Sequence, residues 1–94
     1  MAAWVYIVTN KRDGTLYIGV TSDLPRRVWE HREGVVDSFT KRYRLKQLVW
    51  FETHDEITQA IRREKTLKEW PRAWKVDLIE KTNPEWADLY EQLA

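Results

Sequence analysis

The sequence predicts an α+β fold in which helices flank a small three-stranded, mostly antiparallel sheet. Two β-branched and aromatic runs flank a turn that ends in Asp13-Gly14, which is typical of a hairpin. Helix caps and helical periodicity follow at several places further along the chain. The length of 94 residues is enough for one compact domain and too short for two. We expect the element order ββαβααα.

The N-terminal hairpin is predicted from two strands, residues 4–9 and 16–20. Residues 10–14 have turn chemistry between them. If the register brings Tyr6 near Tyr17, both phenols lie on one surface of the sheet.

A first helix is predicted over residues 24–33. Ser22 and Asp23 are capping residues, and Pro25 suits the first turn. Gly34 follows the last turn, where a left-handed conformation commonly ends a helix.

The middle of the chain is predicted to be a polar, basic connection over residues 34–44 and a third strand over residues 45–53. A long helix is then expected over residues 56–69. His54 or Asp55 is expected to cap it.

The C-terminal part is predicted to be helical from residue 72 to residue 93. Pro71 separates a helix over residues 72–80 from the helix before it, and residues 83–85 open a last short helix that ends near Leu93. The chain has no recognisable linker, so we expect residues 1–94 to be a single domain with its motif region at residues 4–69.

Composition excludes several classes of site. The absence of Cys excludes disulfides and thiolate metal sites, and no apolar stretch is long enough to cross a bilayer. Gly occurs only at positions 14, 19 and 34, so there is no glycine-rich phosphate loop. Neither a nucleophilic triad nor a two-His zinc motif is evident. No secretory signal is visible, so we expect a cytoplasmic protein.

Charge is unevenly distributed although the net charge is only +1. Residues 1–50 hold nine Lys or Arg against five Asp or Glu, whereas residues 51–94 hold seven against ten. This asymmetry favours an anionic partner such as nucleic acid, although basic runs are commonly solvated surfaces. The two basic groups are Lys41, Arg42, Arg44 and Lys46, and Arg62, Arg63, Lys65 and Lys68.

Polar side chains occupy several positions where helical periodicity expects apolar ones. Glu64 interrupts an inward stripe of the long helix, so its carboxylate must be paired, bind a metal or lie in a cleft. Arg27 and His31 are one turn apart on one face of the first helix. The other members of these two stripes are Ile57, Ala60, Ile61 and Leu67, and Leu24 and Val28.

Each candidate also has a structural explanation. The two phenols can be a packing pair, Arg27 and Glu64 can form a salt bridge, and His31 can be a core residue. As a set, however, two Tyr, an Arg, a His and a Glu can bind an anion and one hydrated cation. We therefore expect the five side chains to converge on one concave surface.

These residues carry a resemblance to a known family. Trp4-Val5-Tyr6, followed after ten residues by Tyr17-Ile18-Gly19, resembles the paired motif that names the GIY-YIG nuclease superfamily. Arg27-x-x-x-His31 and Glu64 fall where that family keeps its Arg, His and metal-binding Glu. The chain is most similar to the small stand-alone bacterial proteins of the excinuclease-C-like group.

The sequence raises two questions about its fit to the family pattern, one in the name motif and one at a supporting Asn. Trp4 stands in place of the first Gly of the name motif, although the Tyr is retained. Some relatives also carry a supporting Asn, for which Asn83 is the candidate here.

The resemblance implies hydrolysis of phosphodiester bonds in nucleic acid with one Mg²⁺ or Mn²⁺ held by Glu64, and we expect DNA, more than RNA, to be the substrate. Tyr6 would be the general base and His31 would accept its proton. Tyr17 would orient the water, and Arg27 would grip the scissile phosphate. The two basic groups would contact backbone phosphates without selecting a sequence.

Two other classes remain open. The same fold can bind nucleic acid without cleaving it. Alternatively, the six Trp can form a protein-interaction surface, which a large exposed apolar patch would indicate.

Overall fold

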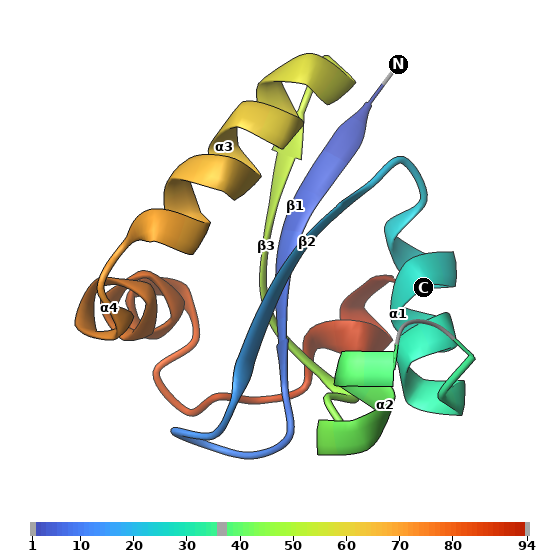
Figure 1. The fold of residues 1–94 in the computed structure, drawn as a ribbon, viewed down its shortest axis with the longest axis vertical. Helices are drawn as coiled ribbons and strands as arrows, with labels where there is room; N and C mark the ends of the chain where they lie inside the picture. The colour runs from blue at the N-terminus through green and yellow to red at the C-terminus, as the bar shows by residue number, and fades with distance from the viewer. Residues whose placement is uncertain (1, 36–37, 94) are drawn as a thin grey trace.

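The fold is a three-stranded sheet between two layers of helices (Figure 1). A computed structural model describes residues 2–35 and 38–93, with residues 38 and 39 by their backbone alone. The strands are β1 (Ala3–Thr9), β2 (Leu16–Thr21) and β3 (Gln47–His54). Their order is β2-β1-β3, and both pairings are antiparallel. The predicted α+β class and three-stranded sheet are confirmed.

The hairpin register determines which side chains are neighbours. Tyr6 lies opposite Gly19, and Val8 lies opposite Tyr17. Because alternate residues of a strand share a face, Tyr6 and Tyr17 are diagonal neighbours on the same face. The register therefore confirms the expected pair of phenols on one surface.

Helices cover both faces of the sheet. α1 (Leu24–Glu33) and α2 (Ser38–Tyr43) lie on one side, and α3 (Ile57–Glu69) and α4 (Arg72–Thr82) lie on the other (Figure 1). A short 3₁₀ helix, η1 (Leu89–Leu93), returns to the side of α1.

Two apolar clusters fill the spaces between these layers. The cluster on the α3 and α4 side includes Val5, Ile7, Ala60, Leu67 and Ile79. The cluster on the α1 side includes Tyr6, Val8, Leu24, Val28 and Leu48. The strict alternation along β1 thus sends Tyr6 towards α1 and its neighbours Val5 and Ile7 towards α3.

The first helix begins and ends as predicted. The Asp23 side chain accepts a hydrogen bond from the Arg26 backbone N–H, and Pro25 lies in the first turn. Gly34 has φ +71° and closes the last turn.

The predicted element order ββαβααα lacks one helix, because α2 occupies part of the predicted polar connection over residues 34–44. Residues 36 and 37 of the predicted connection lie outside the described part of the chain. Helix α2 ends with Arg44 at φ +56°, where the Leu45 N–H donates to the Thr40 carbonyl. A closing bond of this kind leaves no pattern of apolar residues in the sequence. The helix could therefore not be predicted from periodicity.

Helix α3 differs from its prediction in two respects. It begins at Ile57 after Glu56, without a side-chain cap, so the expected cap at His54 or Asp55 is wrong. Ile57 and Ile61 are exposed, whereas Ala60 and Leu67 are buried. The buried face is therefore narrower than the predicted apolar stripe.

The C-terminal segment is also less helical than predicted. Helix α4 continues to Thr82, and the last helix starts at Leu89 instead of near residue 83. Asn83 is the reason. Its Oδ1 accepts from the Ala87 N–H, and its Nδ2 donates to the carbonyls of Val49 and Ala87. These bonds hold residues 83–87 in a turn against β3.

Asn83→Ala should lower the free energy of unfolding by about 2–3 kcal/mol, because it removes three hydrogen bonds from a buried amide. Thermal unfolding would measure the loss as a fall in Tm of roughly 10–20 °C. Asn10→Ala is the matched control, since it removes one bond from the Thr15 N–H and should cost about 1 kcal/mol. Equal stability of the two variants would contradict this role of Asn83.

None of the helices in the described residues combines the length and the apolar character that a membrane-spanning segment needs.

Candidate functional site

Tyr6, Tyr17 and His31 form a three-ring cluster between the sheet and α1. The Tyr6 hydroxyl and His31 Nε2 are joined by a hydrogen bond of 2.9 Å. The Tyr17 ring lies 6.5 Å from the Tyr6 ring and 5.6 Å from the His31 ring, measured between centroids. Three of the five expected site residues therefore contact one another.

The cluster is open to solvent on the Tyr17 side. Tyr6 is 2% exposed and His31 is 3% exposed, whereas Tyr17 is half-buried. Tyr17 is therefore the most exposed member of the cluster.

Gly19 makes room for the Tyr6 ring. A Cβ atom at Gly19 would lie 2.4 Å from both Cζ and the hydroxyl oxygen of Tyr6, much closer than carbon atoms pack. The glycine is directly opposite Tyr6 in the register. It is a site residue that periodicity alone could not identify, because its contribution is the space it leaves.

Arg27 lies one turn before His31 on α1, on the same side of the sheet as the cluster. Its side chain is 40% exposed, and its Nη1 pairs with the Glu30 carboxylate at 3.5 Å. Glu30 also pairs with Arg26 at 3.6 Å. Sequence reasoning missed Glu30, although its spacing from both arginines is the usual signal for such pairs.

Glu64 approaches from the other layer. Its helix packs on the face of the sheet opposite to Tyr6, so Glu64 comes to the expected surface from the other layer, and convergence of all five side chains stays a prediction. The Glu64 side chain is 15% exposed, and its Oε2 lies 3.5 Å from Lys68 Nζ. The suggested Arg27–Glu64 salt bridge is not the pairing in this structure, because Arg27 pairs with Glu30.

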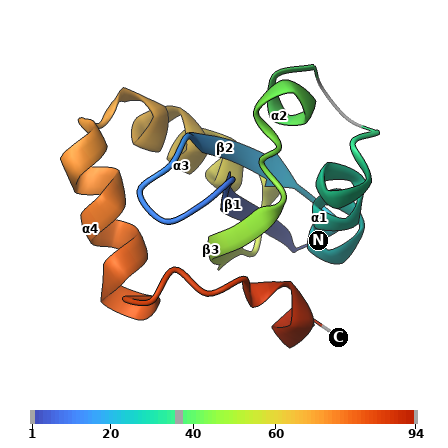
Figure 2. The same cartoon turned by 90° about the horizontal axis from the view of Figure 1, so that it is seen from below.

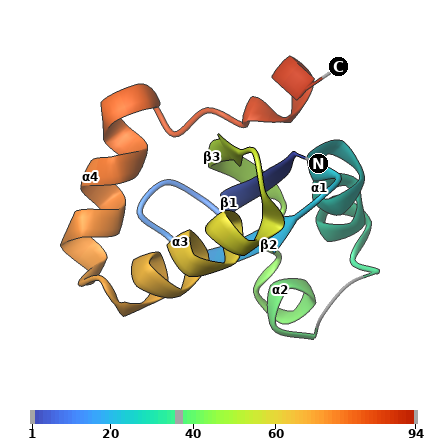
Figure 3. The same ribbon diagram turned by 90° about the horizontal axis from the view of Figure 1, so that it is seen from above.

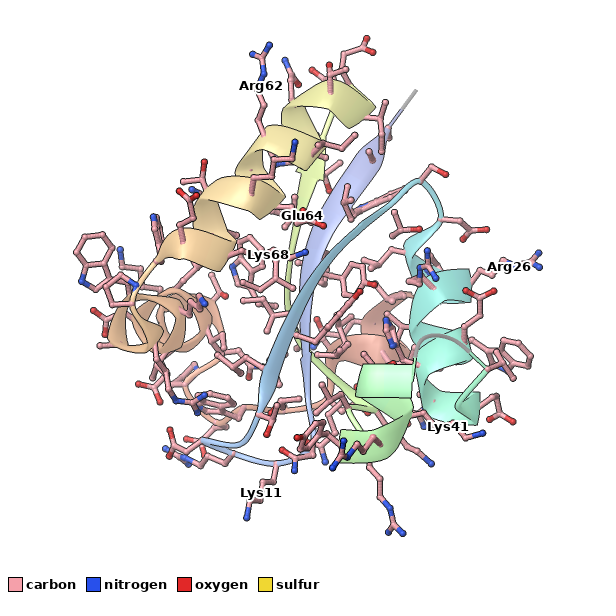
Figure 4. The ribbon with its side chains drawn as sticks, viewed as in Figure 1. Lys11, Arg26, Lys41, Arg62, Glu64 and Lys68 are labelled. Atoms are coloured by element: carbon pink, nitrogen blue, oxygen red, sulfur yellow. The ribbon has the colours of Figure 1, made fainter. Side chains whose placement is uncertain are left out.

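The site residues of the two layers lie near the edge strand β2. Glu64 and Lys68 both extend from α3 towards β2 (Figure 4). A shallow cavity of about 300 Å³ is lined by Leu16, Tyr17 and Ile18 of β2 together with Lys68 and Lys75. Tyr17 and the partner of Glu64 therefore share one cavity.

The helices that carry most of the two basic groups lie on either side of the same edge. In views from below and from above, β2 lies between α3 and α2 (Figures 2 and 3). Lys41, Arg42, Arg44 and Lys46 are exposed, as are Arg62, Lys65 and Lys68. Arg63 is different, since its Nε donates to Glu52 at 3.1 Å and its guanidinium lies over the Trp70 ring.

The donor set around Glu64 fits a hydrated hard cation. Among residues 2–35 and 38–93, no group of three or more His, Asp or Glu could hold a metal ion. A cation at Glu64 would therefore have at most two such side chains of the described residues as ligands, and water would complete its coordination. This arrangement suits Mg²⁺, which retains several of its waters.

Comparison with models of protein families identifies the family of this chain. A model of the GIY-YIG catalytic domain matches residues 2–77. The chain belongs to the GIY-YIG family. The match includes all five candidate residues, and the predicted family resemblance is confirmed.

Relatives of this GIY-YIG protein are small proteins of similar length. The UPF0213 protein of Staphylococcus saprophyticus is 38% identical over 81% of this chain and 92% of the relative. The UPF0213 protein of Haloquadratum walsbyi is 40% identical over 82% of this chain and 85% of the relative. A solution NMR structure of a UPF0213 protein from Bacillus halodurans aligns with a TM-score of 0.59, 28% identity, and coverage of 94% and 93%.

The tryptophans of this GIY-YIG protein do not gather on one surface. Trp50 and Trp86 are buried, while Trp29 on α1 and Trp74 on α4 are exposed. These two helices lie in opposite layers (Figure 1). Trp70 and Trp74 stack edge to face at 5.7 Å, which makes a local pair rather than a large apolar patch.

Proposed function

We propose that this GIY-YIG protein is a metal-dependent endonuclease that hydrolyses phosphodiester bonds in nucleic acid, with DNA as the expected substrate. The observation that carries the proposal is the hydrogen bond between the buried Tyr6 hydroxyl and His31 Nε2, beside the half-buried Tyr17. A phenol joined to an imidazole can pass a proton to it and then accept one from water.

In the proposed reaction, the Tyr6 hydroxyl gives its proton to His31 and then takes a proton from the attacking water. The water oxygen forms a bond to phosphorus, and the bond from phosphorus to the 3′ oxygen breaks. Tyr17, the member nearest solvent, orients the water by hydrogen bonding. Glu64 would hold a divalent cation, which would supply Lewis-acid stabilisation of the charge on the leaving oxygen.

Arg27 would bind the scissile phosphate. Its guanidinium can donate two parallel hydrogen bonds to phosphate oxygens. In this structure Arg27 pairs with Glu30, and the Arg27 side chain is 40% exposed. Because exposed ion pairs contribute little free energy, a phosphate can replace Glu30 as the partner of Arg27 at a small cost in free energy.

The nucleic acid would follow the edge of β2, which lies between α2 and α3 (Figure 3). Both helices carry exposed basic residues. We assign the phosphate contacts to Lys41, Arg42, Arg44, Lys46, Arg62, Lys65 and Lys68. The ion pair of Arg63 with Glu52 argues for a structural role of that residue instead. Phosphate contacts position the strand without selecting a sequence.

Matched phenol variants test the proposed function. Tyr6→Phe and Tyr17→Phe should each reduce Mg²⁺-dependent cleavage of labelled DNA by about 10²–10⁴-fold. Tyr90→Phe is the control, since this phenol packs under Arg32 outside the cluster and should cleave like the wild type. Binding without cleavage by the wild-type protein would favour the silent nucleic-acid-binding alternative.

The Arg42→Glu/Arg44→Glu variant should bind DNA more weakly and with a smaller salt dependence. Loss of two phosphate contacts lowers the slope of log K against log salt by about 1.8. Lys11→Glu/Arg12→Glu changes the net charge equally at the hairpin turn and should keep the wild-type slope. Fluorescence anisotropy over a salt series measures both. Equal slopes for the two variants would show that the α2 group is only a solvated surface.

A further inference from the structure

Lys68 stands between Glu64 and the cavity beside Tyr17. Its ammonium lies 3.5 Å from the Glu64 carboxylate, and the same side chain lines the cavity of about 300 Å³ that Tyr17 also lines. Lys75 lines that cavity too, and its Nζ donates to the Lys68 carbonyl at 3.4 Å. Lys68 and Lys75 thus line one cavity together with Leu16, Tyr17 and Ile18.

The two partners of this ion pair differ in their freedom to move. The Glu64 side chain is 15% exposed, whereas the Lys68 side chain is 50% exposed. An exposed lysine loses little when it leaves such a partner. A divalent cation on the carboxylate would repel the ammonium, because both are positive and compete for the same oxygens.

We propose that Lys68 is the counter-ion of Glu64 until a divalent cation binds, and that the displaced ammonium then binds a phosphate of the nucleic acid in the cavity beside Tyr17. This inference rests on the proposed metal site at Glu64. It adds a site for the nucleotide adjacent to the scissile bond, with Lys75 as the second cation.

Such an exchange couples the two binding events. Metal binding frees a phosphate ligand, so it strengthens binding of nucleic acid through Lys68. Reciprocity requires that bound nucleic acid strengthens metal binding by the same factor. The protein would therefore bind its substrate more tightly when the cation is present.

Metal titration without nucleic acid tests the competition. Isothermal titration with Mn²⁺ should give about 3–10-fold tighter binding for Lys68→Met than for the wild type, because the competing ammonium is gone. Lys81→Met removes an exposed charge from α4 and should stay within about twofold of the wild type. Equal effects of the two variants would overturn the inference.

Binding of nucleic acid in a metal chelator tests the release of Lys68. Glu64→Gln should bind single- or double-stranded DNA about threefold tighter than the wild type, since Lys68 has no carboxylate to hold it. Glu69→Gln changes the net charge equally at an exposed position and should gain less. In a Lys68→Met background the gain from Glu64→Gln should vanish.

The outcomes separate this inference from the proposed function. If the wild type binds no divalent cation, or binds it equally after Glu64→Gln, the proposed metal site itself fails. If the wild type binds Mn²⁺ through Glu64 but the gain from Glu64→Gln persists without Lys68, only the exchange of Lys68 is overturned.

Discussion

Glu64→Gln is expected to reduce metal-dependent cleavage by about 10³-fold or more, because it removes the carboxylate to which we assign the cation. The free energy of unfolding should change by less than about 0.5 kcal/mol. The only charge partner that the structure gives Glu64 in the described residues is Lys68, a half-exposed lysine four residues away, and such helix pairs contribute little.

Thermal unfolding of the wild type and Glu64→Gln, each with and without Mg²⁺, measures the stability side of this prediction. Mg²⁺ should raise the Tm of the wild type and leave the variant unchanged, since a ligand stabilises the state that binds it. A loss of about 3–5 kcal/mol in the variant, which breaking a buried ion pair produces, would assign Glu64 a structural role.

Gly19→Ala should damage both stability and activity. The added Cβ would lie 2.4 Å from the tip of the Tyr6 ring, so the ring must move away from its hydrogen bond with His31. Overpacking of this kind costs about 1–3 kcal/mol. Because the same movement separates the proposed base from its proton acceptor, cleavage should fall by at least about 10²-fold.

A double variant separates this clash from a general backbone effect. Tyr6→Leu shortens the side chain that meets the new Cβ, so Tyr6→Leu/Gly19→Ala should be more stable than the sum of the single losses predicts, by about 1 kcal/mol or more. Its cleavage should remain low because the phenol is absent. Strictly additive losses in denaturant unfolding would mean that Gly19 does not act through the Tyr6 ring.

The strands and the first helix could be predicted because their signals are local. Asp-Gly turn chemistry, β-branched runs and the Asp23 and Gly34 caps each specify backbone geometry within a few residues. Helix α2 and the turn at residues 83–87 depend on bonds that periodicity does not reveal. The Asn83 amide, for example, bonds to the Val49 carbonyl of a distant strand.

In the candidate site, too, some features could be predicted from the sequence and others depend on tertiary structure. The spacing of Tyr6, Tyr17 and His31 identified three side chains that the fold brings into contact. Glu64 was identified from its place in an apolar stripe. The layer in which it lies could not be predicted, because an apolar stripe does not indicate which face of the sheet the helix covers. Its pairing with Lys68, and not Arg27, follows from that placement.

The central claim is that one metal-dependent site joins the Glu64 layer to the Tyr6–Tyr17–His31 cluster around the edge of β2. Mn²⁺ titration into isotopically labelled protein tests this claim most directly, because the paramagnetic ion broadens nearby NMR signals. We predict that the ring signals of Tyr17 and His31 broaden before those of Trp29 and Trp74, and that Glu64→Gln abolishes this selectivity. Broadening that bypasses Tyr17 and His31, or that persists unchanged in Glu64→Gln, would contradict the account.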